Sequence, residues 1–200
     1  MKKMNYQKIL MELVKTLDYV PKLLLHSCCA PCSTTCISFL TNYFDITILY
    51  YNPNIEPIEE YEKRKEEQIR LLKEIPHKNK LDIIDIDYDN ESFLNIVKGL
   101  ELEKEGGIRC HKCYELRLRK TALIAKEKGF DYFGTTLSVS PYKNSQVLNE
   151  LGKKISEEVK VKYLFSDFKK NEGYKKSIEL SEKYNLYRQK YCGCRYGRNN

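Results

Sequence analysis

The chain has 200 residues, of which 42% are hydrophobic and 32% charged, a composition that excludes a disordered chain. No apolar run reaches the roughly 18 residues that predict a membrane-spanning helix. Its eight cysteines fall below the density of about 8–10% found in disulfide-stapled secreted domains. The net charge of +7 favours encounter with a polyanion such as RNA, although a lysine-rich composition alone gives the same charge.

Helical and strand patterns alternate along the chain. Apolar residues at helical spacing predict a helix over residues 5–18, and the apolar run over residues 22–26 predicts a buried strand. Further strands are predicted over residues 45–51, 82–87, 130–135 and 161–165. Further helices are predicted over residues 33–42, 57–74, 92–100, 113–128, 144–159 and 173–184. We interpret the charge run over residues 59–67 as a solvated helix face.

This alternation predicts an α/β fold, a Rossmann-like parallel sheet with helices on both faces. Residues 1–200 show no linker or repeat, so we expect a single domain with an N-terminal helix extension (1–20) and a C-terminal tail (185–200). Residues 1–20 lack the apolar core of a signal peptide, and a cytoplasmic protein with no membrane partner is expected.

The cysteines occur in three groups, and the first two suggest metal binding. Cys28 and Cys29 follow the first predicted strand, at the edge where ligands bind in parallel sheets. Cys110-His-Lys-Cys113 is predicted as a turn entering a helix, whose N-terminal amides favour thiolates. Four thiolates hold an iron–sulfur cluster or a structural zinc. The adjacent pair favours iron, because neighbouring side chains are expected to diverge too far to share one zinc.

The remaining cysteines carry other interpretations. Cys192-Gly-Cys194 can close a small, strained and easily reduced disulfide, with two further metal ligands as the alternative. Cys32 is left open between lining a metal site and a structural turn. Cys36, one helical turn later, is expected to be a buried helix cysteine.

Polar residues also follow the predicted strands. His26 either assists a ligand or is a hydrogen-bonded core histidine, and His111 is expected to face outward. The hydroxyl-rich segment 135–143 is expected to contact substrate, with a well-bonded loop as the alternative. Asp167-Phe-Lys-Lys170 offers a carboxylate and two cations at the same edge.

Together these segments resemble the QueH family of cobalamin-independent epoxyqueuosine reductases, in order over residues 22–196. The resemblance implies a fold similar to the adenine-nucleotide α-hydrolase-like (HUP) proteins, with cysteines in place of the glycine-rich loop that binds pyrophosphate in their ATP-using members. The segments that carry it are His26-Ser-Cys-Cys-Ala-Pro-Cys32, Tyr51-Asn-Pro-Asn-Ile55, Cys110-His-Lys-Cys-Tyr114 with Arg117-Leu118, segment 135–143, Asp167-Phe-Lys-Lys170 and Leu186-Tyr-Arg-Gln-Lys-Tyr-Cys-Gly-Cys194.

The resemblance implies a cofactor and a redox pair. It places a 4Fe–4S cluster on Cys28, Cys29, Cys110 and Cys113. An additional iron ion beside the cluster would draw on Cys32 or Asp167. Cys192 and Cys194 would form a redox-active pair.

The implied reaction is the two-electron reductive deoxygenation of epoxyqueuosine to queuosine at the wobble position of tRNA, with electrons from an external donor. Tyr142, Lys143 and Asp167 are the candidate proton donors. Two alternatives remain, an ATP-dependent tRNA-modifying enzyme of the same fold and a zinc-stabilised RNA-binding module.

Overall fold

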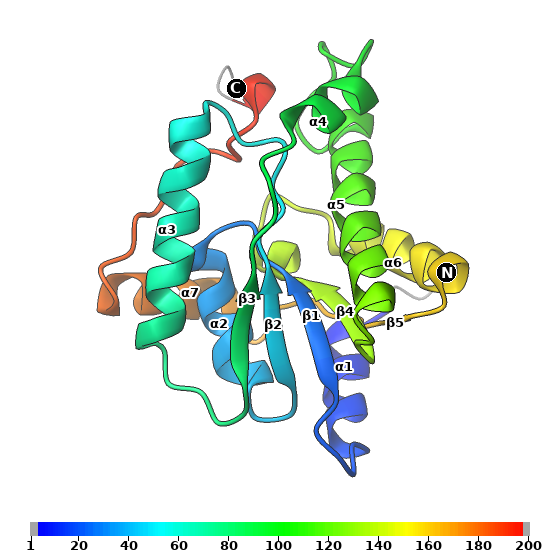
Figure 1. The fold of residues 1–200 in the computed structure, drawn as a ribbon, viewed down its shortest axis with the longest axis vertical. Coiled ribbons are helices and arrows are strands. Elements are labelled where there is room, and N and C mark those ends of the chain that lie inside the picture. Colours follow the sequence, from blue (N-terminus) through cyan, green and yellow to red (C-terminus); the bar gives the residue numbers. More distant parts are fainter. Residues whose placement is uncertain (1–3, 198–200) are drawn as a thin grey trace.

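A five-stranded parallel sheet forms the centre of the computed structural model, which describes residues 4–197 (Figure 1). The strand order is β3-β2-β1-β4-β5, and this confirms the predicted α/β, Rossmann-like fold. The outermost residues of the two expected extensions, 1–3 and 198–200, lie outside the described residues. The strands are β1 (Lys22–His26), β2 (Asp45–Leu49), β3 (Leu81–Ile84), β4 (Tyr132–Thr135) and β5 (Lys162–Tyr163).

Helices cover both faces of the sheet (Figure 1). Because strand side chains alternate, Leu23 and Leu25 of β1 pack on one face, with α1, α2 and α3, and Leu24 packs on the other, with α5 and α6. The helices are α1 (Tyr6–Lys15), α2 (Ala30–Leu40), α3 (Ile58–Glu74), α4 (Asn90–Val97), α5 (Ile108–Glu127), α6 (Ser145–Val159) and α7 (Gly173–Lys183), with short 3-10 helices η1 (Thr136–Val139) and η2 (Arg195–Gly197).

The strand order reverses at β1, which lies between β2 and β4. His26, the last residue of β1, pairs with Thr135, the last residue of β4. The turn that carries Cys28 and the start of η1 therefore open side by side at the carboxyl edge. This is the position at which open parallel sheets bind their ligands.

The two helices that carry the site cysteines begin earlier than their patterns predict. α2 begins at Ala30, since Pro31 fits the first turn of a helix, where its missing N–H breaks no hydrogen bond. Cys29 is the N-cap and Cys32 lies within the helix rather than in a turn. α5 begins at Ile108, directly after the extended N-cap Gly107, so that the Cys-x-x-Cys motif occupies its first two turns. None of the helices in residues 4–197 combines the length and apolar character needed to cross a bilayer.

Candidate active site

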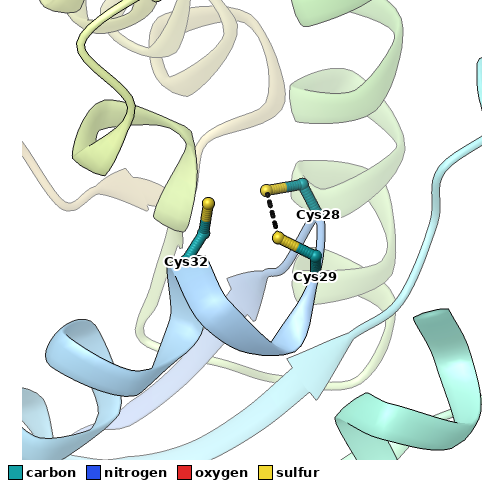
Figure 2. Close-up of side chains that lie close together, drawn as sticks. All are labelled: Cys28, Cys29 and Cys32. Carbon is teal, nitrogen blue, oxygen red and sulfur yellow. Dashed lines mark hydrogen bonds between the residues drawn. The ribbon is translucent and has the colours of Figure 1, made fainter. Parts of the chain in front are cut away.

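Three sulfur atoms from the turn after β1 and the start of α2 converge on one point (Figure 2). The Sγ atoms of Cys28, Cys29 and Cys32 all lie within 4.8 Å of one another, and those of Cys28 and Cys29 are 3.7 Å apart. The extended backbone at Cys29 (φ −175°, ψ 159°) begins the helix here. The adjacent pair thus converges, and the expected divergence, used to favour iron over zinc, is wrong. Three thiols this close can hold a metal.

The pKa values of these three thiols differ, so they do not lose their protons together. Hydrogen bonds from Cys29 and Cys32 hold the pKa of Cys28 well below its ordinary value, and Lys143 and Arg117 add to this effect. The same contact with Cys28 raises the pKa of Cys29 to about 12, and contacts with both neighbours raise the pKa of Cys32. Cys28 is therefore the first thiolate of the group, and the thiolate is the form that binds metals.

Cys110 and Cys113 lie in the first two turns of α5 and do not belong to this group of three. The N–H of Gly106 donates to the Sγ of Cys110 at 3.2 Å, and Arg117 Nη1 donates to the Sγ of Cys113 at 3.9 Å. Burial raises the pKa of Cys110, and it raises that of Cys113 to about 12. Their role as cluster ligands stays a prediction.

A cavity of about 910 Å³ opens beside Cys28 and Cys32. Cys192 also lines it, so sulfur atoms from two distant parts of the chain face one space. This volume lies at the upper end of that of small-molecule sites. Positive charge dominates its wall, because Glu105 is the one acidic residue that lines it in the described part of the chain. The cationic residues that line it are Arg64, Arg117, Lys143, Arg188 and Lys190. Such a wall suits an anionic ligand.

The C-terminal tail is held over this cavity by backbone contacts. Arg64 Nη1 donates to the carbonyl oxygen of Cys192 at 3.1 Å, and the N–H of Glu56 donates to that of Gly193 at 2.9 Å. Cys194 is not among the described residues that line the cavity and packs against the hydrophobic cluster that contains Cys113. Cys192 and Cys194 are both free thiols, so the disulfide predicted between them is not formed in the structure. Their redox role stays a prediction.

Two contacts at the site involve residues to which the sequence analysis gave no role. Gln189 Nε2 donates to the Sγ of Cys29 at 2.8 Å. Arg64 is only 2% exposed, so the interpretation of its charge run as a solvated face is wrong at this position, although Arg64 does pair with Glu60 one helical turn away, at 2.7 Å. Gln189 lies within a segment that resembles the family, which was a usable signal. The burial of Arg64 depends on the tail, 128 residues away, and nothing in the sequence around Arg64 predicts it.

His26 is a hydrogen-bonded core histidine and does not face the three cysteines as a ligand. Its Nδ1 lies 3.0 Å from Thr135 Oγ1, and its Nε2 lies 3.1 Å from the carbonyl oxygen of Tyr51. Burial, with help from Arg117, lowers the pKa of His26 to about 3, so that the ring is neutral. His111 is half-buried and lines a second cavity of about 420 Å³ between α5 and α6.

The predicted substrate-contacting segment divides into two parts. Residues 136–139 form the buried helix η1, whereas residues 140–143 line the cavity. Asp167 is buried, accepts a hydrogen bond from Ser145 Oγ at 3.0 Å and lies 3.8 Å from Lys169 Nζ. It does not line the cavity formed by the described residues. The geometry therefore brings Tyr142 and Lys143 to the cysteines, but not Asp167.

Comparison with known proteins shows the family of this chain. The family model described as "Epoxyqueuosine reductase QueH" matches residues 23–200. Proteins named "Epoxyqueuosine reductase QueH" from Staphylococcus epidermidis and Streptococcus pyogenes are 46% and 43% identical over 199 residues, covering 96% and 97% of this chain and 84% and 78% of theirs. One from Thermotoga maritima is 36% identical over 174 residues, covering 86% of this chain and 87% of its own length. The chain therefore belongs to the epoxyqueuosine reductase QueH family.

Proposed function

We propose that this chain is an epoxyqueuosine reductase, which converts epoxyqueuosine to queuosine at the wobble position of tRNA. The observation that carries the proposal is the basic cavity of about 910 Å³ with Cys28, Cys32 and Cys192 on its wall, in a member of this family. A wobble base lies in a loop, where it can be unstacked into a pocket. Because the substrate is tRNA, we expect the chain to act in the cytoplasm. It would do so as a single domain, with electrons from an external donor.

The proposal includes a 4Fe–4S cluster on Cys28, Cys29, Cys110 and Cys113. At Cys28 and Cys29 the donor chemistry fits, because these sulfurs converge and the lowered pKa of Cys28 favours a thiolate-bound metal. Cys110 and Cys113 are the ligands that the resemblance to the family adds. When bound, such a centre supplies single electrons and a Lewis acid for the epoxide oxygen. For an additional iron the geometry favours Cys32 over Asp167, since Cys32 lies with the other sulfurs and Asp167 is engaged by Ser145.

The redox pair matches the stoichiometry of the reaction. Reduction of the epoxide to an alkene breaks both C–O bonds, consumes two electrons and two protons, and releases the oxygen as water. Oxidation of the Cys192 and Cys194 thiols to a disulfide releases two electrons and two protons, and the external donor then restores the thiols. Cys192 lines the cavity while Cys194 packs against the cluster that contains Cys113, so Cys192 is the one that we expect to face the substrate.

Lys143 is our proposed proton donor to the leaving oxygen. It lines the cavity and is half-buried. Burial lowers the pKa of Lys143, but its electrostatic interactions with Cys192 and Cys28 outweigh this effect and raise that pKa overall, so the side chain stays charged. Lys169 Nζ donates to the carbonyl oxygen of Lys143 at 2.7 Å and fixes its backbone.

The activity test uses tRNA that bears epoxyqueuosine, a chemical reductant and no cobalamin. Queuosine should appear in the nucleoside digest at the expense of epoxyqueuosine. An unchanged digest from protein with a full complement of iron would refute the proposed function.

The two groups of cysteines have different expected phenotypes. Cys110→Ala should remove the broad visible absorbance and the bound iron of protein purified without oxygen. Cys194→Ala should keep both and lose turnover. Loss of iron in the Cys194 variant would instead make this cysteine a metal ligand, and colourless parent protein with stoichiometric zinc would contradict the cluster.

A further inference from the structure

Tyr142 is the most exposed aromatic side chain in residues 4–197, with 77% of its surface accessible, and it lines the mouth of the basic cavity. Within that part of the chain its ring makes no hydrogen bond, aromatic contact or cation–π contact. The other two tyrosines of the cavity are engaged, Tyr174 with Arg188 at 5.4 Å and Tyr191 with Arg64 at 5.2 Å. An exposed aromatic ring at a ligand site indicates a contact made on binding.

The backbone presents this ring on a fixed support. The N–H of Lys143 donates to the carbonyl oxygen of Ser140 at 3.3 Å, which closes a β-turn with Pro141 at its second position and Tyr142 at its third. Proline fixes its own φ and stiffens the turn. Asn144 then caps α6, accepting from the N–H of Gln146 at 2.9 Å. Only the two side-chain torsions of Tyr142 remain to be ordered when a ligand binds.

The charges next to the ring select the class of ligand. Lys143 follows Tyr142 in the chain, and Lys190 lines the same cavity from the tail. An aromatic face flanked by cations is the arrangement with which proteins bind single-stranded nucleic acid, because the base stacks and the phosphates pair with the cations.

We propose that Tyr142 is a stacking platform for a nucleobase of the tRNA anticodon loop, next to the nucleoside that enters the cavity. This inference rests on the proposed function and assigns Tyr142 a positioning role in place of proton donation. Stacking uses the face of the ring and needs no hydroxyl. Phenylalanine should therefore replace Tyr142, whereas alanine should not.

The test compares Tyr142→Ala and Tyr142→Phe with the parent, and uses Tyr19→Ala as the control. Tyr19 is 53% exposed and does not line the cavity. Dissociation constants for unmodified tRNA are measured by fluorescence anisotropy, and kcat and KM with tRNA that bears epoxyqueuosine. Tyr142→Ala should raise Kd and KM about ten-fold, or about 1.4 kcal/mol, and leave kcat unchanged. Tyr142→Phe and Tyr19→Ala should match the parent.

Two results would overturn the stacking role. One is a Tyr142→Ala protein that binds tRNA as tightly as the parent. The other is a Tyr142→Phe protein that binds tRNA as weakly as Tyr142→Ala, which would show that the hydroxyl, rather than the face of the ring, makes the contact. An inactive parent whose tRNA binding still weakens in Tyr142→Ala would refute the proposed reaction alone, and the stacking role would stand.

Discussion

Arg117 is a buried cation, only 1% exposed, and none of the hydrogen bonds that it makes within residues 4–197 goes to a carboxylate. Its Nη2 donates to Asn52 Oδ1 at 2.5 Å, and its Nη1 donates to the thiol of Cys113. A buried guanidinium costs several kcal/mol unless nearby negative charge offsets it. Burial lowers the pKa of Arg117, but its electrostatic interactions with Cys113 and Cys28 outweigh this and raise it overall. The cation and the Cys28 thiolate therefore stabilise one another.

His26, next to Arg117, must stay neutral, and this makes stability depend on pH. Its pKa is lowered by burial to about 3 in the folded chain, against about 6.5 when unfolded. As pH falls below 6.5, the unfolded chain takes up a proton that the folded chain refuses. The stabilisation is thus present above pH 6.5 and is lost towards pH 3, at about 1.4 kcal/mol per pH unit.

We predict that His26 alone removes about 2 kcal/mol of unfolding free energy between pH 7 and pH 5. The measurement is urea unfolding of the parent and His26→Gln at both pH values. The variant should be less stable at pH 7 and should lose about 2 kcal/mol less on acidification. His77→Gln, at an exposed histidine, is the control and should behave as the parent. Equal losses in His26→Gln and the parent would contradict the prediction.

At the scale of elements, the C-terminal tail depends on one glycine. Gly193 has φ +103°, a conformation that side chains with a Cβ rarely adopt. A Cβ there would lie 2.9 Å from Ile55 Cγ1 and 3.0 Å from Arg64 Nη1. Arg195 anchors the next turn of the tail through two bonds to Glu56, at 2.6 and 2.8 Å. A side chain at residue 193 must therefore displace Cys192 and Cys194 from the positions that they occupy next to Ile55 and Arg64.

Gly193→Ala should release the tail while the sheet stays folded. We expect faster cleavage by trypsin after Lys190, an exposed residue, and loss of most turnover. Gly197→Ala is the matched control, since within the described part of the chain its Cβ would meet only Cys192 Cβ, at an ordinary 3.9 Å. If Gly193→Ala is cleaved and turns over as the parent does, the prediction is wrong, because the tail then tolerates a side chain at this residue.

The bounds of the helices and strands show how much of the fold local sequence patterns predict. β1 begins and ends where its apolar run predicts, at Lys22 and His26, because a buried strand is marked by hydrophobicity alone. β5 is shorter than its pattern over residues 161–165, since Leu164 is buried beyond the strand and burial continues past the pairing. Pro31 is a local start signal for α2 that the helical periodicity alone does not use.

The site could be predicted from sequence only in part. The parallel-sheet rule places Cys28 at the ligand-binding edge, and the resemblance adds the tail that carries Cys192. The convergence of Cys28 with Cys29 depends on backbone angles at a single cap residue, which composition and spacing do not encode. The contact of Gln189 with Cys29 spans 160 residues, and only the folded chain brings it about.

At the scale of the whole molecule, the charged residues that give the net charge of +7 are distributed in a way that composition does not reveal. Among the residues that the structure describes, five cations and one acidic residue line the cavity. Outside it, many charged side chains form pairs within helices, as Lys153 does with Glu157 at 3.9 Å. Exposed pairs of this kind contribute little field at a distance. The cavity is therefore the part of this surface to which tRNA phosphates should be drawn.

This distribution predicts a steep salt dependence of tRNA binding that single cavity lysines control. Each phosphate that a cation contacts adds about 0.7–0.9 to the slope of log Kd against log salt concentration, because binding releases counterions. Lys190→Ala should weaken binding at low salt and reduce that slope by about one. Lys153→Ala removes an equal charge from α6, away from the cavity, and should leave the slope unchanged. The slopes are obtained from tRNA-binding titrations at KCl concentrations between roughly 50 and 200 mM. Equal reductions in the two variants would mean that net charge, rather than the cavity, attracts the RNA.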